Sequence, residues 1–215
     1  MSNVLFLDFD GPLFPSRTIQ WHPDNRARTY PGTVLKGLSN PHSPRYWKMD
    51  EISVDMLNEL YKVYAFDTVV SSSWRRVCSL EFIEELFQVN GLNLTLHEDW
   101  DTPTRTFRNC RRSEEINEWM EAHPDVEDCM VIDDRSSGES LFGLQQARSN
   151  ARIYGDRKFV EPYPRIGKIM MVDEEFGISR YDFLNMQDYI KEFWMEDKEW
   201  VEKRQREEAI LRCLM

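Results

Sequence analysis

The sequence lacks long apolar runs, which argues against a transmembrane helix, and we expect no membrane partner. No stretch of its 215 residues approaches the roughly 18 consecutive apolar residues of a transmembrane helix. The N-terminal segment has no basic region and enters a strand-like run, Val4 to Leu7, almost at once. A cleavable secretion signal needs a basic region before its apolar part, so we expect a cytoplasmic protein.

Cysteine and histidine are scarce and scattered. Cys78, Cys110, Cys129 and Cys213 form no Cys-x-x-Cys pair, and none stands at zinc-finger spacing from the four histidines. This spacing argues against a structural zinc site and favours reduced thiols.

Positive charge is also in deficit, because 27 basic residues face 38 acidic ones and the net charge is −11. Binding along an extended duplex needs a broad basic surface, so we do not expect it. Two basic islands nevertheless stand out. Residues 15–48 carry a local charge of +5 and residues 102–113 a local charge of +4. Such islands in an acidic chain favour a localised anion site.

The apolar pattern predicts an α/β fold. Short apolar runs typical of strands occur at 4–7, 66–70, 92–96, 129–132 and 168–172. Helical spacing occurs near 56–64, 80–90, 113–122 and 179–193. Alternating strands and helices predict a Rossmann-like, mainly parallel sheet with helices on both faces. We expect one domain over 1–195, an irregular insertion at 15–50, and a charged C-terminal helix at 196–215.

Polar residues follow three of the predicted strands. Asp8 and Asp10 follow the first, Ser71 to Ser73 the second, and Asp133 with Asp134 the fourth. The carboxyl ends of parallel strands share one edge of the sheet, so these groups should meet there.

Clustered carboxylates repel one another, and a bound cation compensates them. Oxygen ligands suit Mg²⁺, so we predict a magnesium site formed by Asp8, Asp10, Asp133 and Asp134. Gly11 permits the sharp exit from the first strand. Carboxylates, a cation, hydroxyls and arginines together are typical of phosphoryl transfer.

In these motifs the chain resembles the haloacid dehalogenase (HAD) phosphohydrolases. Asp8-Phe9-Asp10-Gly11 is similar to their first motif, Val69-Val70-Ser71 to their second and Val131-Ile132-Asp133-Asp134 to their fourth. Arg111-Arg112 stands where the third motif places a basic residue, usually lysine. The Ser-x-Trp at 72–74 and residues 112–124 and 173–179 resemble the Swiss Army Knife type of HAD domain, which occurs with RNA-repair enzymes.

The resemblance implies a role for each matching residue. Asp8 would be the nucleophile that forms an aspartyl-phosphate, and Asp10 the acid and base, its backbone carbonyl binding the metal. Asp133 would bind Mg²⁺ directly, with Asp134 beside it. Ser72, or else Ser71, would hold the phosphoryl group. Arg112, or else Arg111, would take the third-motif role.

The insertion suggests the substrate. It carries Trp21, Tyr30, Tyr46 and Trp47 among its arginines, and aromatic side chains beside cations suit a stacked base next to a phosphate. The alternative is that Trp21 and Trp47 only anchor the loop. We expect the other two tryptophans considered, Trp74 and Trp119, to lie in the core. The candidate substrate contacts are Gly11, Arg17, Trp21, Trp47 and Arg75.

The expected activity is therefore a Mg²⁺-dependent phosphomonoesterase whose substrate is a nucleotide or a nucleic-acid end. A small-metabolite phosphatase is the alternative within the same fold. The non-enzymatic alternatives are a receiver-like phospho-acceptor, since Ile132-Asp133-Asp134 resembles a receiver's acidic start, and an inactive phosphate-binding module. The C-terminal helix offers a surface on which a second copy of the chain could dimerise.

Overall fold

The computed structural model of the protein describes residues 2–21, 47–103, 112–134 and 168–200, together with residues 202, 203 and 206. Most of the predicted insertion, Arg111 and most of the predicted C-terminal helix lie outside these ranges. Residues 198–200, 202, 203 and 206 of that last segment are helical. In the part of the chain that is described, no helix combines the length and apolarity needed to cross a bilayer.

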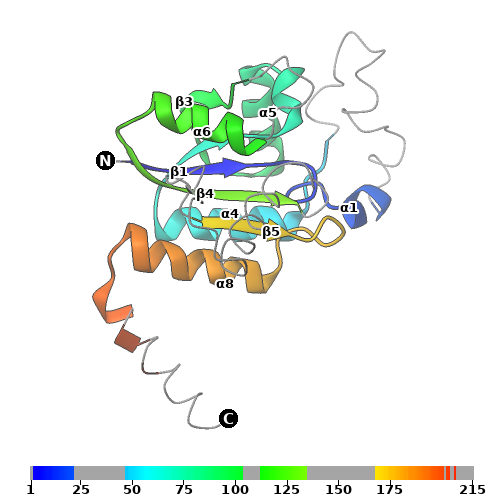
Figure 1. The fold of residues 1–215 in the computed structure, drawn as a ribbon. Helices are drawn as coiled ribbons and strands as arrows, with labels where there is room; N and C mark the ends of the chain where they lie inside the picture. Colours follow the sequence, from blue (N-terminus) through cyan, green and yellow to red (C-terminus); the bar gives the residue numbers. More distant parts are fainter. Residues whose placement is uncertain are drawn as a thin grey trace, which may run out of the picture.

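A five-stranded parallel sheet forms the centre of the fold (Figure 1). Its strand order is β3-β2-β1-β4-β5. The strands are β1 (Ser2–Leu7), β2 (Asp67–Val70), β3 (Thr95–Asp101), β4 (Val126–Asp134) and β5 (Lys168–Val172). The first strand is thus central, flanked by the two strands that also end in predicted site residues. The predicted fold class is confirmed.

Helices cover both faces of the sheet. The helices of the described residues are α1 (Ser16–Trp21), which lies beyond the strand ends, and α4 (Glu51–Val63), α5 (Leu80–Asn90), α6 (Arg112–Ala122) and α8 (Arg180–Tyr189), with a 3₁₀ turn η2 (Ser73–Arg76) and a π-helical turn η3 (Ile190–Trp194). Figure 1 shows α6 on one side of the sheet and α4 and α8 on the other.

The alternation of side chains along β1 explains the two layers. Leu5 and Leu7 belong to the core shared with α4, α5 and α8, whereas Val4 and Phe6 pack with Ile116 of α6. Successive side chains of a strand point to opposite faces, so a strand covered on both sides is apolar throughout. This is why continuous apolar runs predicted β1 and β4.

Two helix ends carry capping residues. Gly91 ends α5 in the left-handed conformation, with φ 70°, and Ser179 and Asp182 form a capping box at α8. The third-motif helix, predicted over 113–122, begins at Arg112.

Asp50 fastens the point where the chain returns from the predicted insertion. Its carboxylate accepts hydrogen bonds from Arg17 Nη2 and Thr18 Oγ1, both at 2.9 Å, and from the backbone N–H of Ser53 at 3.0 Å. The last of these caps α4. One side chain therefore joins α1 to α4.

A distant loop caps the short helix α1, which the sequence did not predict. The backbone N–H groups of Ser16 and Arg17 donate to the carbonyls of Glu174 and Glu175, at 2.8 and 3.1 Å. Both ends of the predicted insertion are thus fixed to the domain that carries the site.

We predict that Asp50→Ala lowers the free energy of unfolding by about 2 kcal/mol or more. It removes an N-cap, whose loss typically costs about 0.5–2 kcal/mol, and the bonds from Arg17 and Thr18. Asp50→Asn should lose less, because asparagine is an equally good N-cap. Denaturant titration of both variants measures the difference, and equal loss in both would contradict this role for the cap.

The Asp50 contribution should also depend on pH. Burial opposes ionisation of Asp50, but hydrogen bonds from Arg17, Ser53 and Thr18 outweigh it and lower the pKa of this carboxyl. A lowered folded-state pKa stabilises the fold above the unfolded pKa, and this contribution is lost as the pH falls through the folded value. The stability gap between wild type and Asp50→Asn should therefore shrink below about pH 4.

Candidate active site

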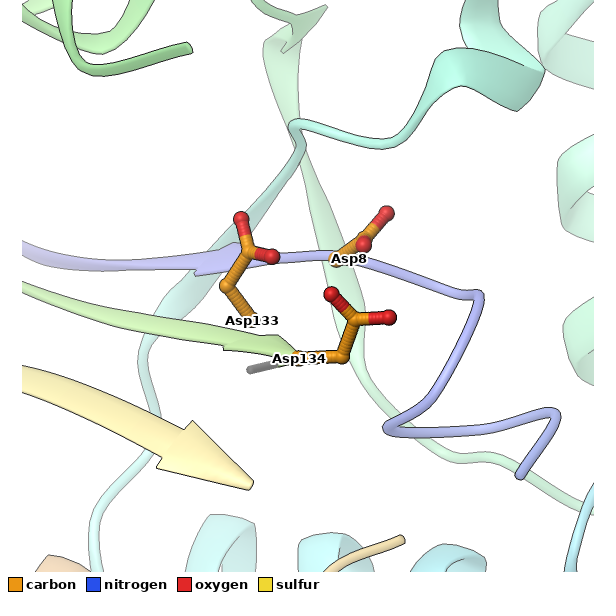
Figure 2. Close-up of side chains that lie close together, drawn as sticks. All are labelled: Asp8, Asp133 and Asp134. Carbon is orange, nitrogen blue, oxygen red and sulfur yellow. The ribbon is translucent and has the colours of Figure 1, made fainter. Parts of the chain in front are cut away.

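Three buried carboxylates meet at the carboxyl edge of the sheet. Leu7 pairs with Ile132, so Asp8 lies beside Asp133, and Asp134 follows at the end of β4. The three side chains point into one region between the two strand ends (Figure 2). One oxygen from each of Asp8, Asp133 and Asp134 lies within 4.8 Å of the others, and all three residues are buried. This is the edge at which the sequence predicted the site.

Arg112 lies between two of these carboxylates. From the first turn of α6, its Nη1 reaches Asp8 Oδ2 at 2.8 Å and Asp133 Oδ2 at 2.7 Å. Burial disfavours the guanidinium charge, but the Asp8 and Asp133 carboxylates outweigh this effect and raise the pKa of Arg112. The predicted third-motif residue is thus at the site, whereas Arg111 lies outside the described residues.

A divalent cation fits this cluster. Asp8 Oδ1 is buried and has no hydrogen-bond partner within the ranges that the structure describes. An unpaired buried carboxylate oxygen is costly, and a cation would satisfy it. Arg112 supplies one positive charge, whereas the cluster holds three carboxylates, so further positive charge would stabilise it. Asp8, Asp133 and Asp134 are the residues that could hold the ion.

Asp10 lies two residues beyond Asp8, where burial raises its pKa to about 7 and the charge of Asp8 adds to this effect. Trp74 Nε1 donates a hydrogen bond to Asp10 Oδ1 at 3.1 Å, which partly opposes the rise. A carboxyl that is protonated near neutral pH can serve as a proton donor.

Gly11 makes room for Asp134. Its φ is +86°, in the left-handed region, and a Cβ built on it would lie 2.4 Å from Asp134 Cβ. No residue with a side chain fits there without moving the carboxylate. The predicted contact of Gly11 with substrate stays a prediction, and the structure shows this packing role in addition.

The two candidate serines differ in their contacts. Ser71 follows the Leu7–Val70 pair, so it stands level with Asp8, and its Oγ is buried without a partner in the described segments. Ser72 Oγ instead accepts the Trp74 backbone N–H and caps η2.

Arg75 lies beneath the site, and its side chain is 1% exposed. Its guanidinium donates to the backbone carbonyls of Ser71, Ser72 and Thr102 and to the Glu115 carboxylate. Arg75 was predicted to contact substrate; in the structure its guanidinium binds these protein groups. It joins the ends of β2 and β3 to α6.

The remaining substrate predictions also change. Trp47 is 8% exposed and packs edge-on against Phe14 and Trp74, which confirms the alternative that it anchors the loop. Arg17 is paired with Asp50. Trp21 ends α1, and its side chain lies outside the described part, as do Tyr30 and Tyr46.

Two site residues were missed from the sequence. The acceptor role of Glu115 needs a partner 40 positions away, and no local signal reveals it. Trp74 is 1% exposed, as predicted for a core residue, but its indole N–H also donates a hydrogen bond to Asp10. The Ser-x-Trp pattern was a signal that this tryptophan belongs to the site.

We predict that Glu115→Ala lowers the free energy of unfolding by about 3–5 kcal/mol, because it leaves the buried Arg75 charge without its carboxylate. Glu115→Gln keeps the volume and a hydrogen-bond acceptor, so it should lose less. Urea denaturation measures both. A loss below about 1 kcal/mol in Glu115→Ala would show that this ion pair does not hold α6 against the sheet.

Comparison with known proteins places the chain in a family. A family model described as the HAD domain in Swiss Army Knife RNA repair proteins matches residues 4–167. Among solved structures, the chain is similar to a haloacid dehalogenase-like family hydrolase from Streptococcus pneumoniae, with 13% identity and a TM-score of 0.39 over 87% of this chain and 91% of that chain. No curated protein matches. Residues 4–167 are more than half of the chain and include the predicted site residues from Asp8 to Asp134. The chain therefore belongs to the family of HAD domains in Swiss Army Knife RNA repair proteins.

Proposed function

We propose that this protein is a Mg²⁺-dependent phosphomonoesterase that acts through an aspartyl-phosphate on Asp8. The observation that carries the proposal is the buried cluster of Asp8, Asp133 and Asp134, in which Arg112 bridges Asp8 and Asp133, with Asp10 two residues after Asp8. Membership of the HAD superfamily supports a hydrolase. Neither a receiver nor an inactive module needs a second, protonatable carboxyl beside the acceptor aspartate.

The chemistry follows from the two aspartates at the end of β1. A carboxylate oxygen of Asp8 forms a bond to phosphorus as the bond to the leaving oxygen breaks, and Asp10 donates its proton to that oxygen. A water then attacks phosphorus, gives a proton to Asp10 and releases phosphate from Asp8. Both side chains return to their starting state.

The other groups bind the charge of the phosphoryl group. Mg²⁺, held by Asp8, Asp133, Asp134 and the Asp10 backbone carbonyl, would neutralise the phosphoryl oxygens. Arg112 holds Asp8 in place and offers a guanidinium to an oxygen of the substrate. We propose that Ser71, and not Ser72, donates its hydroxyl to the phosphoryl group. Ser71 stands beside Asp8, and its Oγ has no hydrogen-bond partner among the described residues.

A nucleotide or a nucleic-acid end is the substrate class we propose. The family occurs in RNA repair proteins, and the basic islands at 15–48 and 102–113 suit a polyanion. The burial of Trp47 removes one of the aromatic residues that the sequence offered for base stacking. A small-metabolite phosphatase remains the second candidate, favoured only if Trp21, Tyr30 and Tyr46 also prove to be structural.

We predict that Asp8→Asn lowers turnover of p-nitrophenyl phosphate by at least about 10³-fold, since an amide cannot replace the nucleophile. Mg²⁺ should raise the melting temperature of the wild type, because it binds only the folded site. The shift should be smaller in Asp8→Asn. EDTA should abolish activity. Full activity of metal-free enzyme, or near-normal turnover by purified, folded Asp8→Asn, would contradict the mechanism.

Substrate preference is tested by kcat/KM for 3′- and 5′-phosphorylated oligonucleotides, nucleoside monophosphates and glucose 6-phosphate. We expect kcat/KM for a nucleotide substrate to exceed kcat/KM for glucose 6-phosphate by roughly 5- to 150-fold, which is the gain in affinity from stacking one base. Trp21→Ala should narrow this gap, whereas Trp47→Phe, which keeps the buried packing, should not. A higher kcat/KM for glucose 6-phosphate would support the small-metabolite reading instead.

A further inference from the structure

Trp74 is a buried aromatic residue near the site, and other aromatic rings surround it. Its ring stacks on Phe14 at a centroid distance of 4.9 Å and an interplanar angle of 8°, and it meets Trp47 and Phe9 edge-on at 5.1 and 5.7 Å. These partners come from the loop after β1 and from the return of the predicted insertion. Contacts on several sides leave the indole little freedom to rotate.

The polar edge of this ring points at the Asp10 carboxyl. Trp74 Nε1 donates to Asp10 Oδ1 at 3.1 Å. Within the part of the chain that the structure describes, no other side chain donates to Asp10. The indole N–H is a donor only, so it always binds a lone pair of that oxygen. Oδ1 is therefore fixed, and Oδ2 is the oxygen left to exchange a proton with substrate or water.

We propose that Trp74 is a positioning residue, which holds the Asp10 carboxyl in the orientation that delivers a proton to the leaving oxygen. The inference rests on the proposed function, because it assigns Asp10 the proton transfer. Packing fixes the indole, and the indole fixes the acid. Pre-organisation of this kind matters because a proton is transferred only over hydrogen-bond distance in a suitable geometry.

Leaving-group dependence separates this role from a structural one. kcat/KM reports the steps up to departure of the leaving group. A good leaving group such as p-nitrophenolate needs no proton, whereas an alkoxide does. A variant with a misplaced acid should lose activity on alkyl phosphates and keep it on p-nitrophenyl phosphate. A variant with a damaged fold should lose activity on alkyl phosphates and on p-nitrophenyl phosphate to the same extent.

The test compares Trp74→Phe, which keeps an aromatic ring but has no N–H, with wild type and Asp10→Asn on a series of aryl and alkyl phosphates. We expect kcat/KM of Trp74→Phe to stay within about threefold on p-nitrophenyl phosphate. It should fall on an alkyl phosphate by about 10- to 100-fold, part of the roughly 10²–10⁴-fold that general acid catalysis supplies. Asp10→Asn should show the same dependence more steeply.

Trp194→Phe is the matched control. Trp194 is 7% exposed, and its Nε1 also donates to a carboxylate, Asp128 Oδ2 at 2.9 Å. Asp128 pairs with Asn3, at the opposite end of the sheet from Asp8. This control loses the same kind of hydrogen bond remote from the site and should leave the leaving-group dependence unchanged.

If Trp74→Phe does not fold, incorporation of benzothienylalanine at position 74 removes only the N–H and keeps the ring shape. The proposal is overturned if, in a folded variant that lacks the N–H, kcat/KM falls equally on p-nitrophenyl phosphate and on alkyl phosphates, or falls on neither. If Asp10→Asn itself shows no dependence on the leaving group, the proposed function fails instead. The two failures are thus distinguished in one series.

Discussion

Repulsion among buried carboxylates is the constraint on which the site depends. Asp8, Asp133 and Asp134 approach one another because β1 and β4 are neighbours and Leu7, the last residue of β1, pairs with Ile132. Such a cluster persists only with compensating positive charge. Arg112 supplies part of it from the start of α6, and an ion would supply the rest. The arrangement that makes the site costly in isolation also makes it suited to a phosphoryl group and its metal.

Buried polar contacts beneath the site hold these charged groups in place. Arg75 ties the carbonyls that end β2 and β3 to Glu115 of α6, the helix that carries Arg112. Trp74, from the same 3₁₀ turn, reaches Asp10. Asp50 fixes the base of the segment that would meet substrate. The η2 turn thus connects the acid, the serines and the third-motif helix, although neither Trp74 nor Arg75 touches the three clustered aspartates.

The elements that could be predicted from the sequence are those whose pattern is local. Continuous apolar runs predicted β1 and β4, and the polar residues after them predicted the aspartate cluster. The edge strand β3 was placed too early, at 92–96, because its solvent-facing residues are polar and its pairing with β2 sets its position. Helix α1 was missed, since its caps come from Glu174 and Glu175. The sequence placed both Arg112 and Arg75 at the site, because both are arginines beside motif residues, but only Arg112 contacts the clustered aspartates. Only the folded contacts distinguish them.

The central claim is a covalent intermediate on Asp8, and acid quenching followed by peptide mass spectrometry tests it most directly. The enzyme is mixed with an aryl phosphate and Mg²⁺, quenched within a turnover and digested. The account predicts that the peptide containing Asp8 gains the mass of one phosphoryl group, and that this gain is absent in Asp8→Asn and in EDTA. Steady turnover with no phosphorylated Asp8, or with the phosphoryl group on another residue, would contradict it.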